Sequence, residues 1–281
     1  MGADPRILVT GAGGQVGRAL RTVCPSARFL LRSDLDVTDV GAVRMAMQGM
    51  DVVVHLAAMT DVDRCEREPD SAARVNGSGT RVVVEAAAER RARVVYLSTD
   101  YVFDGRKRGE YEVDDPPAPL NAFGRSKLAG EEAVHASKEN LIVRTSWVFG
   151  DGRNFVRTIL DAARRGGPLR VVDDQVGRPT WSNDVAAALA HLIRSGATGV
   201  LHVAGDGEPG TWADLAEAAA EAAGLPVAVE RIDSQTYRRT AGRLVAPRPA
   251  NSVLSVESAR AAGVPLGHWR HSLRRYVEAL S

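Results

Sequence analysis

A hydroxyl, an aromatic ring and an amine stand in this chain at spacings that suit the reduction of a carbonyl group. Thr99 ends an apolar run that begins at Val94, and Phe123 and Lys127 follow, four residues apart. Residues at this spacing lie on the same face of a helix. A hydroxyl near a lysine above a nucleotide cofactor is an arrangement that could hold and reduce a ketone. The set has one chemical gap, because a phenyl ring has no proton to donate.

Two elements must bring these residues together. Residues 94–99 read V-V-Y-L-S-T, which is typical of a buried parallel strand whose carboxyl end opens on a ligand crevice. An acidic, proline-rich loop follows, and residues 119–131 then open a helix. Thr99 is therefore predicted at the tip of the strand, with Phe123 and Lys127 on the helix that follows.

A glycine-rich turn near the amino terminus predicts a cofactor site. Residues 6–10 form an apolar strand, G-A-G-G-Q-V-G follows at 11–17, and a helical pattern begins at Val16. Glycines allow the tight turn and close approach of the backbone, while the helix N-terminus offers N–H groups and a positive dipole end to a pyrophosphate. The alternative is an ordinary turn that uses glycine for steric reasons. The contacts predicted in this turn are Gly11, Gly13, Gly14, Gln15 and Val16.

The end of the second predicted strand, residues 27–32, bears on the choice of cofactor. An NAD-binding protein normally has an acidic residue there for the ribose 2′-hydroxyl, whereas this chain has Leu31 and Arg32. Arg32 could pair with a 2′-phosphate, so NADPH is favoured; NADH is the alternative if Asp34 or Asp36 binds the ribose. The remaining cofactor contacts predicted are Arg32, Asp36, Val37, Leu56, Ala57, Ala58 and Lys127.

Strand and helix patterns alternate along the chain and predict an α/β fold, a Rossmann-type doubly wound parallel sheet with a smaller C-terminal α/β substrate-binding lobe. Residues 1–146 are predicted to form the NADP-binding Rossmann domain, completed by parts of 169–203. Residues 147–281 are predicted to form mainly the substrate-binding lobe. The polar stretch 61–69 is predicted to be a loop.

Composition narrows the classes of function. The 281 residues carry a formal net charge of +1 without a long run of one sign, which provides no basic surface for nucleic acid or an anionic membrane. No apolar stretch approaches the roughly 20 residues that span a bilayer. Two cysteines and the lack of an N-terminal signal pattern favour a cytoplasmic protein, and the six histidines show no metal-ligand spacing. The expected partner is a small-molecule substrate, and a homodimer is left open.

In these segments the chain resembles the dTDP-4-dehydrorhamnose reductase family, extended short-chain dehydrogenases/reductases that reduce the 4-keto group of nucleotide-linked 6-deoxysugars. The resemblance runs through nearly the whole length and is much less specific for the sugar than for the family. It rests on I-L-V-T-G-A-G-G-Q-V-G at 7–17, D-V-V-V-H-L-A-A-M-T at 51–60, L-S-T-D-Y-V-F-D-G at 97–105, P-L-N-A-F-G-R-S-K-L-A-G-E at 119–131, R-T-S-W-V-F-G at 144–150, V-V-D-D-Q-V-G-R-P-T at 171–180 and R-P-A-N-S-V-L at 248–254.

This resemblance implies a mechanism in which NAD(P)H gives a hydride to the ketone of a dTDP-4-keto-6-deoxyhexose, for rhamnose or a specialised-metabolite sugar. A tyrosine of a Y-x-x-x-K motif protonates the oxygen, and the lysine lowers the pKa of that phenol. Thr99 and Lys127 match the hydroxyl and the lysine, whereas Phe123 stands where the family has tyrosine. The implied substrate contacts are Thr60, Val62, Thr99, Asp100, Tyr101, Trp147, Gln175, Arg178, Arg248 and Asn251, with Arg64 and Arg153 as further diphosphate candidates. Trp147 could instead pack beneath the second lobe, and Arg178 could be a surface cation.

Phe123 leaves three explanations open. The first is a deliberate Tyr→Phe change that traps a complex. The second is a natural variant with another proton donor, for which Tyr101 or a water held by Thr99 are candidates, and the third is a non-catalytic NADP-binding regulatory subunit of the same family. General acid catalysis is typically worth about 10²–10⁴-fold, so turnover should be impaired. Binding should survive, because phenylalanine keeps the shape and stacking surface of the ring.

Overall fold

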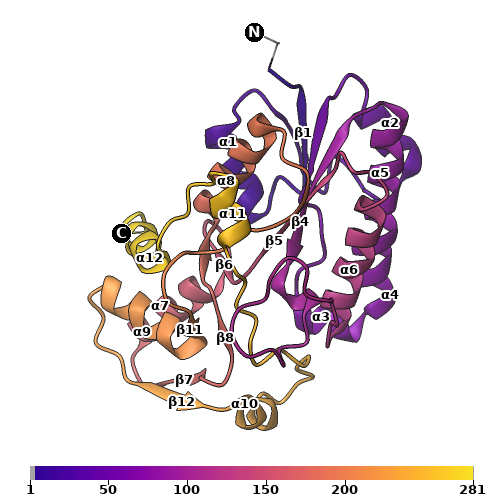
Figure 1. The fold of residues 1–281 in the computed structure, drawn as a ribbon. Coiled ribbons are helices and arrows are strands. Elements are labelled where there is room, and N and C mark those ends of the chain that lie inside the picture. Colours follow the sequence, from indigo (N-terminus) through magenta and orange to yellow (C-terminus); the bar gives the residue numbers. More distant parts are fainter. Residues whose placement is uncertain (1–3, 281) are drawn as a thin grey trace.

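A parallel sheet forms the centre of the molecule. The computed structural model describes residues 4–280 (Figure 1). Six strands lie in the order β10-β5-β4-β3-β1-β2, and each neighbouring pair in this sheet is parallel. Their bounds are β1 Ile7–Thr10, β2 Arg28–Leu30, β3 Val52–His55, β4 Arg93–Thr99, β5 Leu141–Thr145 and β10 Gly199–His202.

Helices cover both faces of the sheet. Side chains alternate along a strand, so Val9 packs into the core that includes α1 and α8, whereas Leu8 packs into the core that includes α2 and α5. Both side chains are fully buried, as expected for a central strand with helices on each side. Figure 1 shows α1 and α8 on one side of the sheet and α2, α5 and α6 on the other. These helices are α1 Gln15–Val23, α2 Val40–Ala46, α5 Gly79–Glu89, α6 Ala122–Val134 and α8 Ser182–Ser195.

The strand order places a crevice at the carboxyl ends of the central strands. β1 pairs with β2 on one side and with β3 on the other, so the chain reverses its direction of travel across the sheet between these two crossovers. Ligands bind at such a switch point in doubly wound sheets. β4 lies next to β3 and ends in Ser98 and Thr99, which brings two hydroxyl groups to the same edge.

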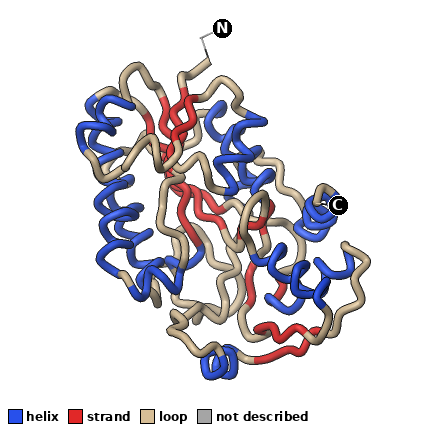
Figure 2. Tube along the Cα trace, turned by 180° about the vertical axis from the view of Figure 1, so that it is seen from behind, coloured by secondary structure: helices blue, strands red, loops and turns tan. Residues whose placement is uncertain are grey.

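A smaller lobe is built mainly from later parts of the chain and lies below the carboxyl edge of the sheet in Figure 1. It contains three two-stranded sheets, and its helices share an apolar core around Phe149, Leu215 and Trp269. Figure 2 shows the same lobe from behind, with short strands beneath its helices. The paired strands are β6 Val148–Phe149 with β9 Thr180–Trp181, β7 Leu169–Val172 with β12 Val229–Ile232, and β8 Val176–Gly177 with β11 Gly210–Thr211; the helices are α7 Phe155–Arg165, α9 Trp212–Ala222 and α12 Trp269–Glu278.

The prediction of a loop at residues 61–69 is wrong. The Asp61 side chain accepts a hydrogen bond from the backbone N–H of Arg64 and caps α3, and Pro69 occupies the first turn of α4, where its missing N–H costs little. The helix-capping residues, and not the polarity of the segment, therefore determine that it forms helices. The remaining short elements are α3 Val62–Arg67, α4 Pro69–Ala72, the π-helical turn η1 Ala73–Ser78, the 3₁₀ turn η2 Asp100–Val102, α10 Ser234–Thr240 and α11 Glu257–Ala261. Within residues 4–280, no helix has both the length and the apolar character needed to cross a membrane.

Candidate active site

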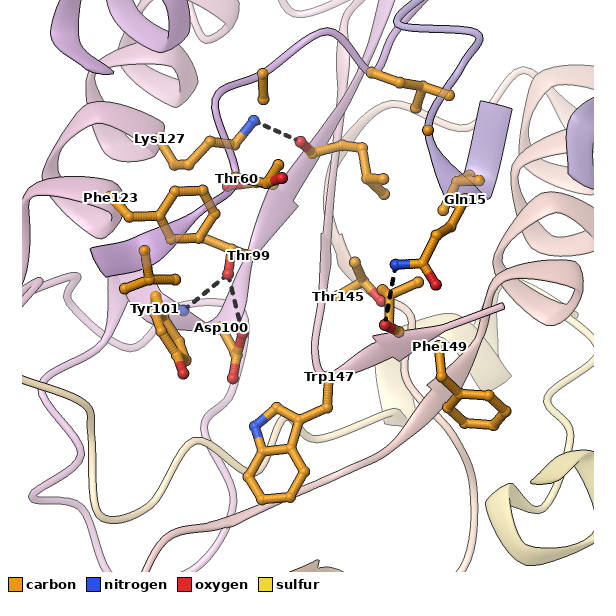
Figure 3. Close-up of a pocket in the computed structure, with 18 of the residues that line it drawn as sticks. Gln15, Thr60, Thr99, Asp100, Tyr101, Phe123, Lys127, Thr145, Trp147 and Phe149 are labelled. Atoms are coloured by element: carbon orange, nitrogen blue, oxygen red, sulfur yellow. Dashed lines mark hydrogen bonds between the residues drawn. The ribbon is translucent and has the colours of Figure 1, made fainter. Parts of the chain in front are cut away.

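One cavity of about 450 Å³ lies at the switch point and reaches from the glycine-rich turn to the lobe (Figure 3). It is lined by most of the residues that the sequence predicted to contact cofactor or substrate, which are Gly11, Gly14, Gln15, Val16, Leu56, Ala58, Thr60, Val62, Thr99, Asp100, Tyr101, Phe123, Lys127 and Trp147. Predicted contacts outside its lining are Gly13, Arg32, Asp36, Val37, Ala57, Gln175, Arg178, Arg248 and Asn251.

The glycine-rich turn fits a dinucleotide pyrophosphate. Gly11 has a positive φ of +68°, and a Cβ there would lie 2.5 Å from the backbone N of Ala57. Only glycine therefore lets β1 turn tightly beside the end of β3. Gly14 is the N-cap residue of α1, so no side chain caps the first N–H groups of the helix. The first turn of α1 also has no acidic residue. The N–H groups and positive dipole end of α1 are thus left for an anion.

Arg32 lies just beyond β2 and is exposed, with no hydrogen bond or ion pair to any residue in the described part of the chain. The two competing carboxylates are engaged locally. Asp34 accepts the backbone N–H of Leu31 at 2.8 Å, and Asp36 accepts the N–H and hydroxyl of Thr38 at 2.9 and 2.8 Å. Those hydrogen bonds shape the turn after β2 and lower the pKa of Asp36. Arg32 is therefore the more available group for a ribose phosphate.

Thr99 and Lys127 are held by hydrogen bonds to residues of β4 and η2. The Thr99 hydroxyl donates to Asp100 Oδ1 at 3.0 Å and accepts the N–H of Tyr101 at 3.2 Å. Lys127 Nζ donates to the carbonyl of Leu97 at 2.9 Å and lies 4.0 Å from the centre of the Tyr96 ring. Burial lowers the pKa of Lys127 to about 7. An amine with this pKa is protonated only about half of the time at neutral pH.

Phe123 is fixed at the same place by the start of α6. The Asn121 side chain caps the helix through the N–H of Gly124 at 2.8 Å. A Cβ on Gly124 would lie 2.0 Å from the carbonyl O of Tyr101, so α6 and η2 touch backbone to backbone. The Phe123 ring meets the Tyr101 ring edge to face, with centroids 6.0 Å apart. The ring lines the cavity and supplies shape but no proton.

Tyr101 is a poor replacement for the absent phenol. Burial raises the pKa of its hydroxyl, and Arg248 forms a hydrogen bond with it and partly opposes the effect of burial. A phenol with a raised pKa gives up its proton less readily. In Figure 3 its ring lies beside Phe123 and its hydroxyl points away from Lys127, which in the family mechanism would activate the phenol.

Four of the residues assigned to the substrate make hydrogen bonds or ion pairs with other parts of the protein. Arg178 is buried and pairs with Glu110 at 2.5 Å, so the alternative of a surface cation is wrong. Gln175 accepts the indole N–H of Trp212 at 3.1 Å and so positions that ring. Arg248 pairs with Asp63 at 2.9 Å, and Asn251 donates to the carbonyl of Lys107 at 2.8 Å. The segment 248–251 therefore connects α3, through Asp63, with the loop that contains Lys107.

A flat aromatic wall closes the lobe side of the cavity. Trp147 and Trp212 stack with centroids 3.7 Å apart and planes 7° apart. Trp147 has a positive φ of 47°, which is strained for a bulky residue, and its indole fills the space that a Cβ on Gly177 would take. Arg153 also lines the cavity and is exposed, with no hydrogen bond or ion pair among residues 4–280. The other diphosphate candidate, Arg64, pairs with Glu68 at 3.0 Å and does not line it.

Sequence reasoning missed several lining residues. Thr145, Val148 and Phe149 lie within two residues of Trp147, so closeness in sequence to a predicted site residue was a usable signal. Trp212 begins a helix of the lobe, and nothing local in the sequence brings it to Trp147. The lining residues not predicted are Gly17, Leu97, Ser98, Thr145, Val148, Phe149, Phe155, Trp212 and Leu215.

Comparison with known proteins identifies the family. Residues 5–281 match the family described as the RmlD substrate binding domain. A dTDP-4-dehydrorhamnose reductase of Mycolicibacterium smegmatis is 41% identical to this chain, over 98% of the chain and 86% of the relative. This chain belongs to the dTDP-4-dehydrorhamnose reductase family.

Other comparisons agree with membership of the dTDP-4-dehydrorhamnose reductase family. A dTDP-4-keto-6-deoxy-D-glucose reductase of Streptomyces niveus is 39% identical, over 98% of each chain. The crystal structure of a dTDP-4-dehydrorhamnose reductase of Bacillus anthracis in complex with NADP has a TM-score of 0.92 and 32% identity, and covers 99% of this chain and 100% of its own. The family suggested by the sequence and the Rossmann-type α/β fold are thus both confirmed.

Proposed function

We propose that this chain is an NADPH-dependent reductase of the 4-keto group of a dTDP-4-keto-6-deoxyhexose, in dTDP-rhamnose or specialised-metabolite deoxysugar biosynthesis. The observation that carries the proposal is one continuous cavity that joins the uncapped start of α1 to Thr99 and Lys127. A cofactor held at α1 and a ketone held at Thr99 would thereby share one space. Family membership sets the class of reaction, and the names of the relatives supply the class of sugar.

Different residues in and near the cavity would bind different parts of the cofactor and of the substrate. The N-terminus of α1 would hold the pyrophosphate of NADPH, Arg32 its 2′-phosphate and Lys127 the nicotinamide ribose. When bound, NADPH supplies the hydride for the ketone carbon. The Thr99 hydroxyl would hold the ketone oxygen. On the lobe side, Arg153 is suited to the sugar diphosphate and the Trp147–Trp212 pair offers a flat face for the base.

Transfer of a labelled hydride tests this function directly. NADPH deuterated at its transferable position, mixed with the protein and a dTDP-4-keto-6-deoxyhexose, should place deuterium in the sugar, as measured by mass spectrometry of the product. Slow transfer is expected, because Phe123 donates no proton. If calorimetry shows that both ligands bind and no label is transferred even over long incubation, the alternative of a non-catalytic NADP-binding regulatory subunit, which Phe123 also favours, replaces this proposal.

Arg32→Gln is expected to weaken NADPH binding by about 10- to 100-fold and to leave NADH binding nearly unchanged, because a hydrogen bond to a charged group contributes about 1.5–3 kcal/mol. Dissociation constants for both cofactors, measured by calorimetry, check this expectation. Arg28→Gln is a matched control, since Arg28 is an exposed arginine at the other end of β2. Equal weakening of NADPH and NADH by Arg32→Gln would contradict an assignment of Arg32 to the 2′-phosphate.

Two further features belong to the proposal, which are the division of the chain and its location. Residues 1–146, with parts of 169–203, would serve the cofactor, and 147–281 would mainly serve the substrate. A cytoplasmic location suits an enzyme that uses NADPH and a nucleotide sugar.

A further inference from the structure

Asp100 is a buried carboxylic acid in the wall of the cavity, and the family mechanism gives it no part in proton transfer. It is 2% exposed and begins η2, directly after Thr99. Its Oδ1 accepts the Thr99 hydroxyl at 3.0 Å, and its Oδ2 has no hydrogen-bond partner of ordinary geometry among residues 4–280. Figure 3 shows the Thr99–Asp100 contact below the Phe123 ring. Burying a carboxylate that has no ion-pair partner costs far more free energy than burying a neutral carboxyl group.

Among residues 4–280, no lysine, arginine or histidine forms an ion pair with Asp100. Its own turn supplies Thr99 and the N–H groups of η2, and the loop at 248–252 supplies the Ser252 hydroxyl. Arg248 of that loop forms its ion pair with Asp63 instead. From α6, Lys127 donates to the carbonyl of Leu97, and Phe123 is apolar. Burial raises the pKa of Asp100 to about 7, against the opposing hydrogen bonds from Ser252 and Thr99.

The protonation state of Asp100 decides where the Thr99 hydroxyl can point. A threonine hydroxyl has one hydrogen to donate and two lone pairs to accept with, and the N–H of Tyr101 uses one lone pair. When Asp100 is ionised, the Thr99 hydrogen is donated to Oδ1. When Asp100 is protonated, its own O–H can donate to the second lone pair of Thr99. The Thr99 hydrogen is then free for a ketone oxygen in the cavity.

We propose that Asp100 is the proton source for ketone reduction in this chain and that its proton reaches the ketone oxygen through the Thr99 hydroxyl. The inference rests on the proposed function. As the hydride forms a bond to the ketone carbon, the C=O electron pair moves to oxygen, which takes the hydrogen of Thr99. Thr99 takes the proton of Asp100, Asp100 becomes a carboxylate, and water reprotonates it before the next turnover. The chain thus has a route for the proton that bypasses position 123.

The first test is Asp100→Asn, which keeps the shape of the side chain and can still donate to Thr99 but cannot transfer a proton. The rate of deuteride transfer from labelled NADPH in a single turnover should fall by about 100-fold or more. In the unsubstituted protein this rate should be highest below pH 7 and fall about tenfold per pH unit above it, because Asp100 loses its proton there. In Asp100→Asn this fall with pH should be absent.

A second background separates proton supply from a structural role. In Phe123→Tyr the new phenol can donate, so adding Asp100→Asn should cost less than about tenfold. An equal loss from Asp100→Asn in both backgrounds would overturn the proposal, as would an unchanged rate and pH profile in the unsubstituted background. If no deuteride is transferred in either background although both ligands bind, both this proposal and the proposed function are wrong.

Infrared difference titration of the protein without ligands provides a readout that does not depend on turnover. The carbonyl band of a protonated carboxyl group should disappear with a midpoint near pH 7, which is the pKa expected for buried Asp100. The band should be missing in Asp100→Asn. A titration without that band would show that Asp100 is ionised at neutral pH and would overturn the proposal.

Discussion

Phe123→Tyr is expected to raise the turnover of a dTDP-4-keto-6-deoxyhexose by about 10- to 100-fold, because a phenol worth about 10²–10⁴-fold as a general acid would replace a route through Asp100 that is itself worth about 100-fold. The ring at position 123 lines the cavity and is held by the capped start of α6, so a phenol would be presented at the site without rearrangement. Lys127, on the same face of α6, would lower the pKa of that phenol. Steady-state oxidation of NADPH that depends on the ketosugar gives the measured rate.

Two controls distinguish the hydroxyl from other effects of changing position 123. Phe123→Leu alters the ring without adding a donor and should bring no gain. Adding Lys127→Met to Phe123→Tyr should remove most of the gain, because the phenol then keeps its ordinary pKa near 10. If Phe123→Tyr binds NADPH and ketosugar as tightly as the unsubstituted chain but turns over no faster, a missing phenol is not what limits this protein.

The cofactor side of the site is predictable from the sequence because its requirements are local. A turn from β1 into α1 that leaves room for a pyrophosphate needs a glycine at positive φ and a helix start without a side-chain cap. Gly11 and Gly14 meet these two requirements, and they lie within four residues of each other in the sequence. Likewise, Phe123 and Lys127 share one helix face whatever surrounds α6. A parallel sheet then brings the ends of its central strands to one edge, which explains why Thr99 lies in the same cavity.

The substrate side is far less predictable, because each of its polar side chains can either point into the cavity or bind another residue of the protein. Arg178 and Gln175 stand in a recognisable block, yet one pairs with Glu110 and the other binds Trp212. Sequence shows that such residues are polar but not where they point. The Trp147–Trp212 stack joins segments far apart in the chain, and only the packing of the lobe creates it. Asp100 was expected to touch substrate, and its burial and its hydrogen bond with Thr99 emerge only from the structure.

Glu131→Gln is expected to destabilise the protein by about 3–5 kcal/mol, because it leaves a buried arginine without its counter-charge. Glu131 lies on α6, one turn beyond Lys127, and pairs with Arg144 of β5 at 2.8 Å. Their side chains are 1% and 4% exposed, so water cannot replace the lost carboxylate. Urea unfolding gives the free energy. Glu89→Gln is the matched control, since its pair with Arg44 is half exposed and should contribute less than about 1 kcal/mol.

The same carboxylate also acts on the site, which gives Glu131→Gln a second consequence. The negative charge of Glu131 raises the pKa of Lys127 against the larger lowering by burial. Without that charge, the pKa of Lys127 should fall further below about 7, so the amine should lose its proton at a lower pH. Replacing both partners, as in Glu131→Leu with Arg144→Met, removes the uncompensated charge and should recover much of the lost stability, while the Lys127 titration stays shifted. A double variant as unstable as Glu131→Gln would show that packing at this position, and not the buried charge of Arg144, sets the cost.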